Sequence, residues 1–275
     1  MEATHRTGIP LYCQRSGIGP PLIGIAGFGC AHWLLQPLAA HLETRYSVWL
    51  PDHRGIGRSP KPKGPFDIED LATDILKIIH DHIKTPVHLL GVSMGGFVVQ
   101  KLMTMAPEHI KTAAILCSTS GGPRFRPLFT YWSAEQMRRV LAMDPDRYAR
   151  WILEPVVSPR LASHPDAFEY MLHQRLSHPE DLQQVMEQYH AMARFFSKAI
   201  ALETVDIPVW VGCGEQDPVF PVANSRLLAQ LLPKGELTLF PETDHLFFVE
   251  KPGEVGQSLL DFFSRHEPRN DHPIR

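Results

Sequence analysis

Three residues of this chain could together carry out nucleophilic catalysis. Ser93 lies in Gly91-Val92-Ser93-Met94-Gly95, where a strand-like apolar run stops and a tight turn opens a helical segment. A serine hydroxyl is a weak nucleophile unless a base takes its proton and a third group orients that base. Asp217 and His245 each follow a different apolar run, and the chain order is Ser, Asp, His. The pattern predicts acyl transfer by Ser93 with His245 as base and Asp217 as its orienting acid.

Other residues compete for the two supporting roles. His53 also follows a strand-like run, but the loop around it is rich in Gly and Arg and is typical of a turn. Glu215 lies two residues before Asp217, and Asp244 directly precedes the histidine, so both are alternatives for the acid. Position after a strand favours Asp217 and His245.

Acyl transfer also requires backbone N–H donors for the oxyanion of the tetrahedral intermediate, and loss of one donor costs roughly 3 kcal/mol. Met94 begins the predicted helix, where unpaired amides and the helix dipole favour negative charge. Gly27-Phe28-Gly29 follows a predicted strand and would bring Phe28 N–H to the same sheet edge. We expect the oxyanion hole to consist of the N–H groups of Phe28 and Met94; a flexible strand-to-helix turn is the alternative for residues 27–29.

The elements that must position these groups follow from apolar periodicity. Strand-like runs alternate with helical segments, which predicts a mostly parallel central sheet flanked by helices. The expected strands lie at 9–14, 21–26, 46–50, 86–91, 113–117, 208–213 and 236–240. The expected helices of this α/β core lie at 33–42, 68–79, 94–105, 221–232 and 253–264.

The alternation stops between residues 122 and 201, which contain only helical stripes. We predict an inserted helical lid at 122–201, a core made of residues 1–121 and 202–265, and a frayed polar tail at 266–275. Aromatic side chains are frequent in the lid, and we expect an apolar substrate pocket beneath it. The residues expected to line this pocket are Trp33, Trp132, Trp151 and Phe247.

Composition limits the kind of partner. The chain has 275 residues, 44% of them hydrophobic, and a formal net charge of −3, so neither nucleic acid nor an anionic membrane is favoured. No run resembles a secretory signal or a membrane span, which predicts a cytoplasmic protein acting on a small molecule; oligomeric state is not indicated. His80-Asp81-His82 ends a helix without a second ligand motif, so neither a metal ion nor an organic cofactor is expected. Lid charges are nearly balanced, although Arg124 or Arg126 could still bind one carboxylate.

Three segments resemble motifs of the α/β-hydrolase family, and the similarity covers residues 9 to about 264. Asp52-His53-Arg54-Gly55-Ile56-Gly57-Arg58-Ser59 is similar to the D-x-R-G-x-G-x-S turn of the family, residues 91–96 to its nucleophile elbow, and residues 244–252 to its histidine loop. The chain looks most like enol-lactonases of the 3-oxoadipate type, methyl esterases and cofactor-free perhydrolases. Ala26 departs from the pattern, since many relatives have His before the glycine of the oxyanion loop.

The resemblance implies an α/β-hydrolase fold with a serine nucleophile. Haloalkane dehalogenases and epoxide hydrolases that resemble this chain would need a carboxylate at position 93, so Ser93 implies acyl transfer. We therefore predict a serine hydrolase that cleaves a small carboxylic ester or lactone through an acyl-enzyme. The alternatives are a C–C bond hydrolase or a perhydrolase with the same triad, and a ligand receptor with residual hydrolase machinery.

Overall fold

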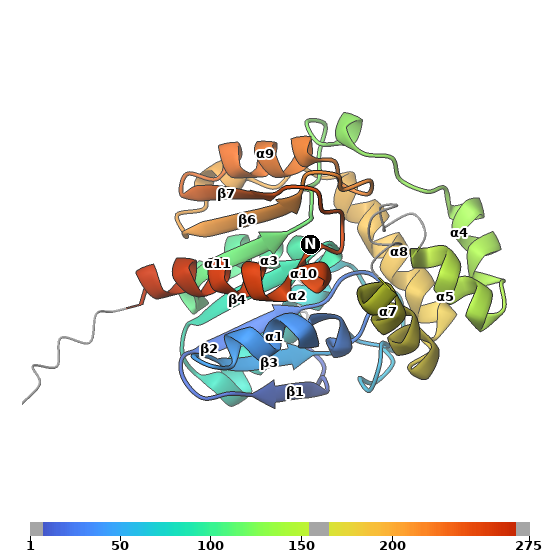
Figure 1. Cartoon of the computed structure of the whole chain (residues 1–275), viewed down its shortest axis with the longest axis horizontal. Coiled ribbons are helices and arrows are strands. Elements are labelled where there is room, and N and C mark those ends of the chain that lie inside the picture. Colours follow the sequence, from blue (N-terminus) through green and yellow to red (C-terminus); the bar gives the residue numbers. More distant parts are fainter. Residues whose placement is uncertain (1–7, 154–164, 268–275) are drawn as a thin grey trace, which may run out of the picture.

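A seven-stranded sheet forms the centre of the chain, with helices on both faces (Figure 1). The computed structural model describes residues 8–153 and 165–267. The strands are β1 (Cys13–Ser16), β2 (Pro21–Ile25), β3 (Ser47–Pro51), β4 (Val87–Val92), β5 (Ile110–Leu116), β6 (Val209–Gly214) and β7 (Gly235–Phe240). Their spatial order is β1-β3-β2-β4-β5-β6-β7, and only the β1–β3 pairing is antiparallel. The predicted α/β fold class is confirmed.

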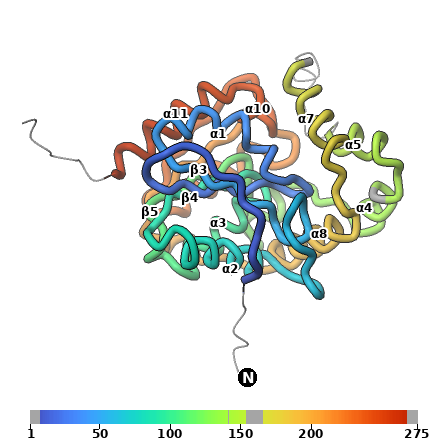
Figure 2. Tube along the Cα trace, turned by 90° about the horizontal axis from the view of Figure 1, so that it is seen from below, coloured from blue at the N-terminus to red at the C-terminus, as the bar shows by residue number. Residues whose placement is uncertain are grey.

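Two hydrophobic layers cover the sheet because its central strands are apolar on both sides. Every residue of β4 is buried, as expected for a parallel strand enclosed by helices. One layer contains α1 (Gln36–Leu42) and α11 (Pro252–Arg265), and the other contains α2 (Ile68–Ile78), α3 (Met94–Met105) and α9 (Val222–Leu231). Figure 2 shows α1 and α11 on one side of the strands and α2 and α3 on the other. Within the described ranges, no helix combines the length and apolar character needed to cross a bilayer.

The first strand differs from the expectation that it spans 9–14. Ile9 N–H donates a hydrogen bond to Asp74 Oδ1 in α2 at 2.7 Å, so the start of this stretch is fixed by a side chain and not by a strand partner. Pairing with β3 begins only at Cys13, which lies opposite Pro51. The predicted strand at 9–14 therefore begins four residues and ends two residues earlier than the observed strand Cys13–Ser16.

The chain between β5 and β6 is helical where helical stripes were predicted. It contains α4 (Ala134–Leu141), α5 (Pro145–Leu153), α7 (Pro165–Ser177) and α8 (Leu182–Phe196), which gather beside one end of the sheet (Figure 1). Part of the predicted lid, 154–164, and most of the predicted tail, 268–275, lie outside the described residues. The domain boundaries at 121/122 and 201/202 stay a prediction.

Candidate active site

Ser93 occupies a strained turn between β4 and α3. Its backbone angles are φ 53° and ψ −115°, a region that costs a non-glycine residue roughly 1–3 kcal/mol. Glycines permit the close approaches around it: a Cβ on Gly91 would lie 2.4 Å from Gly95 O, and a Cβ on Gly95 would lie 2.1 Å from Ile25 O. The turn thus presents the serine at the carboxyl end of β4.

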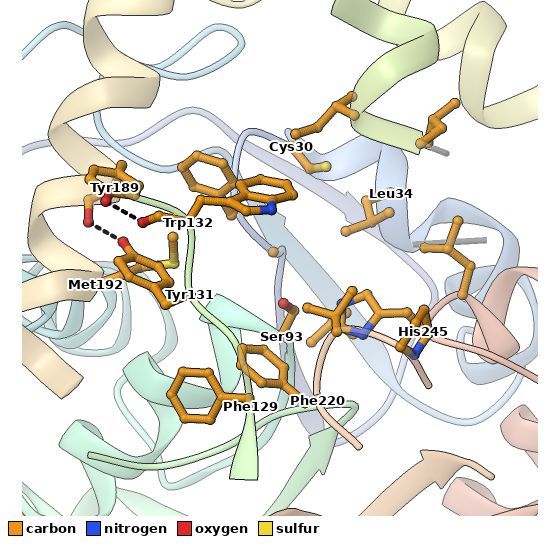
Figure 3. Close-up of a pocket in the computed structure, with 18 of the residues that line it drawn as sticks. Cys30, Leu34, Ser93, Phe129, Tyr131, Trp132, Tyr189, Met192, Phe220 and His245 are labelled. Atoms are coloured by element: carbon orange, nitrogen blue, oxygen red, sulfur yellow. Dashed lines mark hydrogen bonds between the residues drawn. The ribbon is translucent and has the colours of Figure 1, made fainter. Parts of the chain in front are cut away.

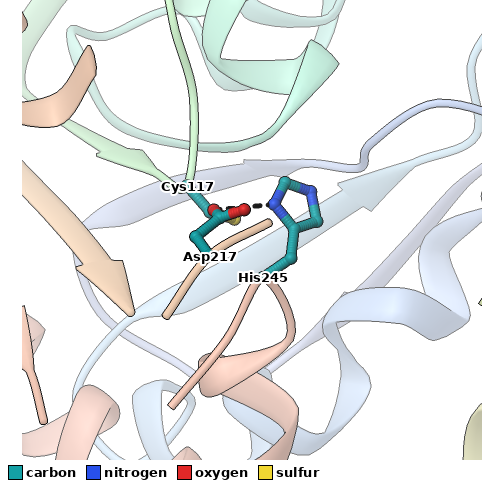
Figure 4. Close-up of side chains that lie close together, drawn as sticks. All are labelled: Cys117, Asp217 and His245. Atoms are coloured by element: carbon teal, nitrogen blue, oxygen red, sulfur yellow. Dashed lines mark hydrogen bonds and ion pairs between the residues drawn. The ribbon is translucent and has the colours of Figure 1, made fainter. Parts of the chain in front are cut away.

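Asp217 and His245 lie together although 28 residues separate them in the chain. His245 Nδ1–H donates to Asp217 Oδ2 at 2.8 Å (Figure 4), and both residues are at least 95% buried. Asp217 Oδ1 accepts the backbone N–H groups of Val219 and Phe220 at 2.8 and 2.9 Å. The carboxylate is therefore fixed, and its bond to Nδ1 leaves Nε2 of the imidazole as the proton acceptor. Figure 3 shows His245 and Ser93 at the same cavity.

The competing acids and base have other surroundings. His53 Nε2–H donates to Ala26 O at 3.0 Å, and burial lowers the pKa of this histidine. Glu215 is exposed, and Asp244 Oδ1 accepts Leu246 N–H at 2.8 Å. Among the described residues, Asp217 is the carboxylate that bonds to His245.

Cys117 is a neighbour of this pair that sequence reasoning did not assign to the site. One potential ligand atom from each of Cys117, Asp217 and His245 lies within 4.8 Å of the other two, so we tested the three as a metal site (Figure 4). Burial raises the pKa of the Cys117 thiol well above its ordinary value, whereas metal ligation requires the thiolate. Asp217 already accepts three hydrogen bonds. The set suits proton transfer better than metal binding, and the expectation of no metal ion stays a prediction.

The two expected oxyanion donors flank the serine. Met94 is the first residue of α3, and Phe28 lines the cavity that Ser93 shares. A Cβ on Gly27 would lie 3.3 Å from Ser93 Cβ, so the loop that carries Phe28 N–H packs directly against Ser93. Phe28 and Met94 therefore both lie close to Ser93, and their role as oxyanion donors stays a prediction.

Distant side chains hold this oxyanion loop. Gly29 N–H donates to Gln188 Oε1 at 2.9 Å, and Gly29 O accepts from Arg175 at 3.2 Å. These contacts span 159 and 146 residues, and no local motif predicts them. Sequence reasoning missed both residues, because a glutamine and an arginine on amphipathic helices carry no sign of what they contact.

The cavity is largely apolar and encloses about 250 Å³, slightly below the 300–1,000 Å³ common for small-molecule sites. Aromatic and aliphatic side chains from α5, α7, α8 and the segment before α4 form its outer wall. Among the described residues that line the cavity, Arg175 is the only lysine, arginine, aspartate or glutamate. The exposed Arg124 pairs with Glu203 at 2.9 Å, and Arg126 donates to Phe196 O at 3.4 Å. The arginine at the cavity is thus Arg175, and not Arg124 or Arg126, which we had considered as possible partners of a substrate carboxylate.

The predicted pocket residues are only partly placed at the cavity. Trp132 lines it, whereas Trp33, Trp151 and Phe247 do not. Trp151 packs behind Trp132 with ring centroids 5.1 Å apart, and Phe247 is buried against Phe240 at 4.9 Å. Trp33 lies in the short helix His32–Leu35 before α1 and is buried in the core. The sequence alone could not assign these aromatic side chains to the core or to the cavity.

The D-x-R-G-x-G-x-S turn has a structural role beside the site. Asp52 Oδ1 accepts His32 N–H at 2.7 Å, and Arg54 makes two 2.7 Å bonds to the buried carboxylate of Asp74. Gly57 N–H donates to Glu180 Oε2 at 3.2 Å, which connects the turn to the chain between α7 and α8. Burial raises the pKa of Glu180 to about 7.

Comparison with known proteins agrees with the fold and with the three sequence motifs described above. A family model with the description alpha/beta hydrolase fold matches residues 20–252. The chain is 29% identical over 248 residues to 3-oxoadipate enol-lactonase 2 of Acinetobacter baylyi, covering 87% of each chain. It is 26% identical over 258 residues to the pimeloyl-(acyl-carrier protein) methyl ester esterase of Chromobacterium violaceum, covering 91% of this chain and 97% of that one. The structure of the proposed non-heme bromoperoxidase BpoC of Mycobacterium tuberculosis is similar with a TM-score of 0.84 and 26% identity, covering 97% of this chain and 100% of that one.

Proposed function

Because the chain belongs to the α/β-hydrolase family, we propose that it is a serine hydrolase that cleaves a small carboxylic ester or lactone through an acyl-enzyme intermediate. The family assignment confirms the resemblance of the three sequence motifs. The observation that carries the proposal is the hydrogen bond from His245 to the buried Asp217, which accepts two further hydrogen bonds, beside a cavity that His245 shares with the strained Ser93.

Each group has a defined task in this proposal. Ser93 Oγ attacks the acyl carbon while His245 Nε2 takes its proton, and the oxyanion accepts hydrogen bonds from Phe28 N–H and Met94 N–H. Asp217 keeps the proton on Nδ1 and stabilises the imidazolium. The imidazolium then protonates the departing alcohol, and water activated by His245 releases the acid and restores Ser93. In a lactone the alcohol and the acid remain one molecule.

The helices α4, α5, α7 and α8 would act as the lid of this site, within the predicted lid at 122–201. Side chains of α5, α7 and α8, with those of the segment before α4, form the apolar outer wall of the cavity, which favours small, largely apolar substrates. The similarity to an enol-lactonase and to a methyl ester esterase supports ester or lactone cleavage. The similarity to BpoC favours a perhydrolase as second candidate, with hydrogen peroxide replacing water in attack on the acyl-enzyme.

A labelled fluorophosphonate and p-nitrophenyl esters of graded chain length test the proposal. We expect the probe to label the wild type but not Ser93→Ala, and we expect this variant to lose ester turnover by roughly 10⁴-fold or more. Ser120→Ala is a matched control, because the Ser120 hydroxyl is buried without a hydrogen-bond partner among the described residues. Undiminished turnover by folded Ser93→Ala would refute the proposal. Peracid formation from acetate and peroxide, faster than ester hydrolysis, would favour the second candidate.

A further inference from the structure

The peptide that carries Phe28 N–H lies in a segment with little conformational preference of its own. Glycine precedes and follows Phe28, and Gly29 has φ +58°, a conformation that favours glycine. A peptide plane between such permissive residues can rotate unless its neighbours are fixed. The direction of Phe28 N–H therefore depends on contacts from outside the loop.

The structure fixes the peptide planes on both sides of this one. On one side Ala26 O accepts His53 Nε2–H at 3.0 Å. On the other side Gly29 N–H donates to Gln188 Oε1 at 2.9 Å, and Arg175 holds the peptide plane after that one by donating to Gly29 O at 3.2 Å. Because peptide groups are planar, holding the planes before and after Gly27–Phe28 leaves the N–H of Phe28 a narrow range of directions.

Gln188 and Arg175 come from the lid, and their burial costs free energy because each leaves a polar atom without a described hydrogen-bond partner. Gln188 is 0% exposed, and its Nε2 has no hydrogen-bond partner among the described residues. Arg175 Nε is likewise buried without a described partner, and no described carboxylate forms an ion pair with its guanidinium. A buried polar group without a partner costs about 1–3 kcal/mol. Gln188 accepts from Gly29 N–H, and Arg175 donates to Gly29 O and to Cys30 Sγ, so the described bonds of both side chains go to Gly29 and the residue after it.

We propose that Gln188 and Arg175 are positioning residues that aim Phe28 N–H at the reacting carbonyl, so that the oxyanion hole is complete only when lid helices α7 and α8 contact the oxyanion loop. The inference rests on the proposed serine hydrolase function. It assigns to the lid a task in the chemical step in addition to enclosing the substrate. It also supplies an anchor for a loop in which Ala26 replaces the histidine of many relatives.

Replacing Gln188 tests the positioning role. Gln188→Leu removes the acceptor of Gly29 N–H, and we expect kcat on a p-nitrophenyl ester to fall about 10- to 100-fold, since a misdirected donor loses part of what deletion of a donor costs. KM should change by no more than about threefold. The inhibition constant of a trifluoromethyl ketone, whose hemiketal oxyanion mimics the intermediate, should rise by the same factor as kcat/KM falls.

Two further variants separate a positioning role of Gln188 from a general effect on the stability of the fold. Gln188→Glu keeps an acceptor oxygen and should recover most of kcat. Gln184→Leu, one turn earlier on α8, is the matched control, because Gln184 Oε1 has no described hydrogen-bond partner. If Gln188→Leu lowers the urea midpoint but leaves kcat of the folded protein and the inhibition constant unchanged, the residue is merely structural and the inference is wrong. Absence of fluorophosphonate labelling in the wild type would instead refute the proposed function.

Discussion

Replacing Glu180 by glutamine should stabilise the protein at neutral and alkaline pH. Burial is the main cause that raises the pKa of Glu180 from 4.5 to about 7, and Asp52 adds repulsion, while the Gly57 N–H bond and Arg175 oppose the rise. Between pH 4.5 and about 7 the folded protein holds a proton that the unfolded chain has released. Rising pH therefore lowers the free energy of unfolding across this window, and above about pH 7 the whole cost is present.

The pKa of Glu180 also sets the size of the effect. At about 1.36 kcal/mol per pKa unit, a rise from 4.5 to about 7 corresponds to an upper limit of roughly 3 kcal/mol. Glu180 is only partly buried by surface area, so we expect about 1–2 kcal/mol. Glutamine keeps an acceptor for Gly57 N–H. The free energy of unfolding of Glu180→Gln should thus exceed that of the wild type by that amount at pH 8 and by much less at pH 5.

Urea unfolding at pH 5, 6, 7 and 8 measures this difference directly. Glu108→Gln is the control for loss of a charge, because the Glu108 side chain is 67% exposed. An equal difference between Glu180→Gln and the wild type at all four pH values would refute the reasoning, since a group that does not titrate between the folded and unfolded states contributes no pH dependence.

Two further predictions concern the elements that carry the site. Gly95→Ala places a Cβ 2.1 Å from Ile25 O and should lower the free energy of unfolding by about 1–3 kcal/mol. Gly64→Ala is the control, because a Cβ there has nothing within 4 Å, and it should change the free energy of unfolding by less than about 0.5 kcal/mol. Similar urea midpoints for the two variants would contradict the steric argument. Arg54→Met leaves the buried Asp74 carboxylate without its bidentate partner and should cost about 3–5 kcal/mol, part of which Arg54→Met combined with Asp74→Leu should recover in the same assay.

The sequence was sufficient for those features that depend on local pattern. Apolar runs of strand length and helical stripes predicted the elements of the sheet and its covering helices, and the fold class is confirmed. Residues just after strands were expected to meet at one edge, because parallel strands share their carboxyl edge, and Asp217 and His245 are in contact there. Their catalytic roles, with that of Ser93, stay predictions until activity is measured.

Features that depend on packing between distant segments could not be predicted. Phe247 and Phe248 are adjacent, equally apolar and both buried in the core, yet of the two only Phe248 also lines the cavity. Which of the two side chains faces the cavity depends on how this segment packs against the rest of the chain, and the residue types do not determine it. The same holds for Gln188, whose contact with Gly29 depends on the placement of α8 relative to a loop 159 residues away.

The two proposed oxyanion donors are positioned in physically different ways, and this difference determines where mutations should act. Met94 N–H is held by the elbow itself, because Met94 begins α3 and the backbone packs closely at the glycines on both sides of Ser93. Phe28 N–H lies between glycines and depends on side chains from other elements, two of them from the lid. Substitutions in the elbow should therefore reduce both folding and activity, whereas substitutions at the lid contacts should reduce kcat in a protein that still folds and still binds substrate.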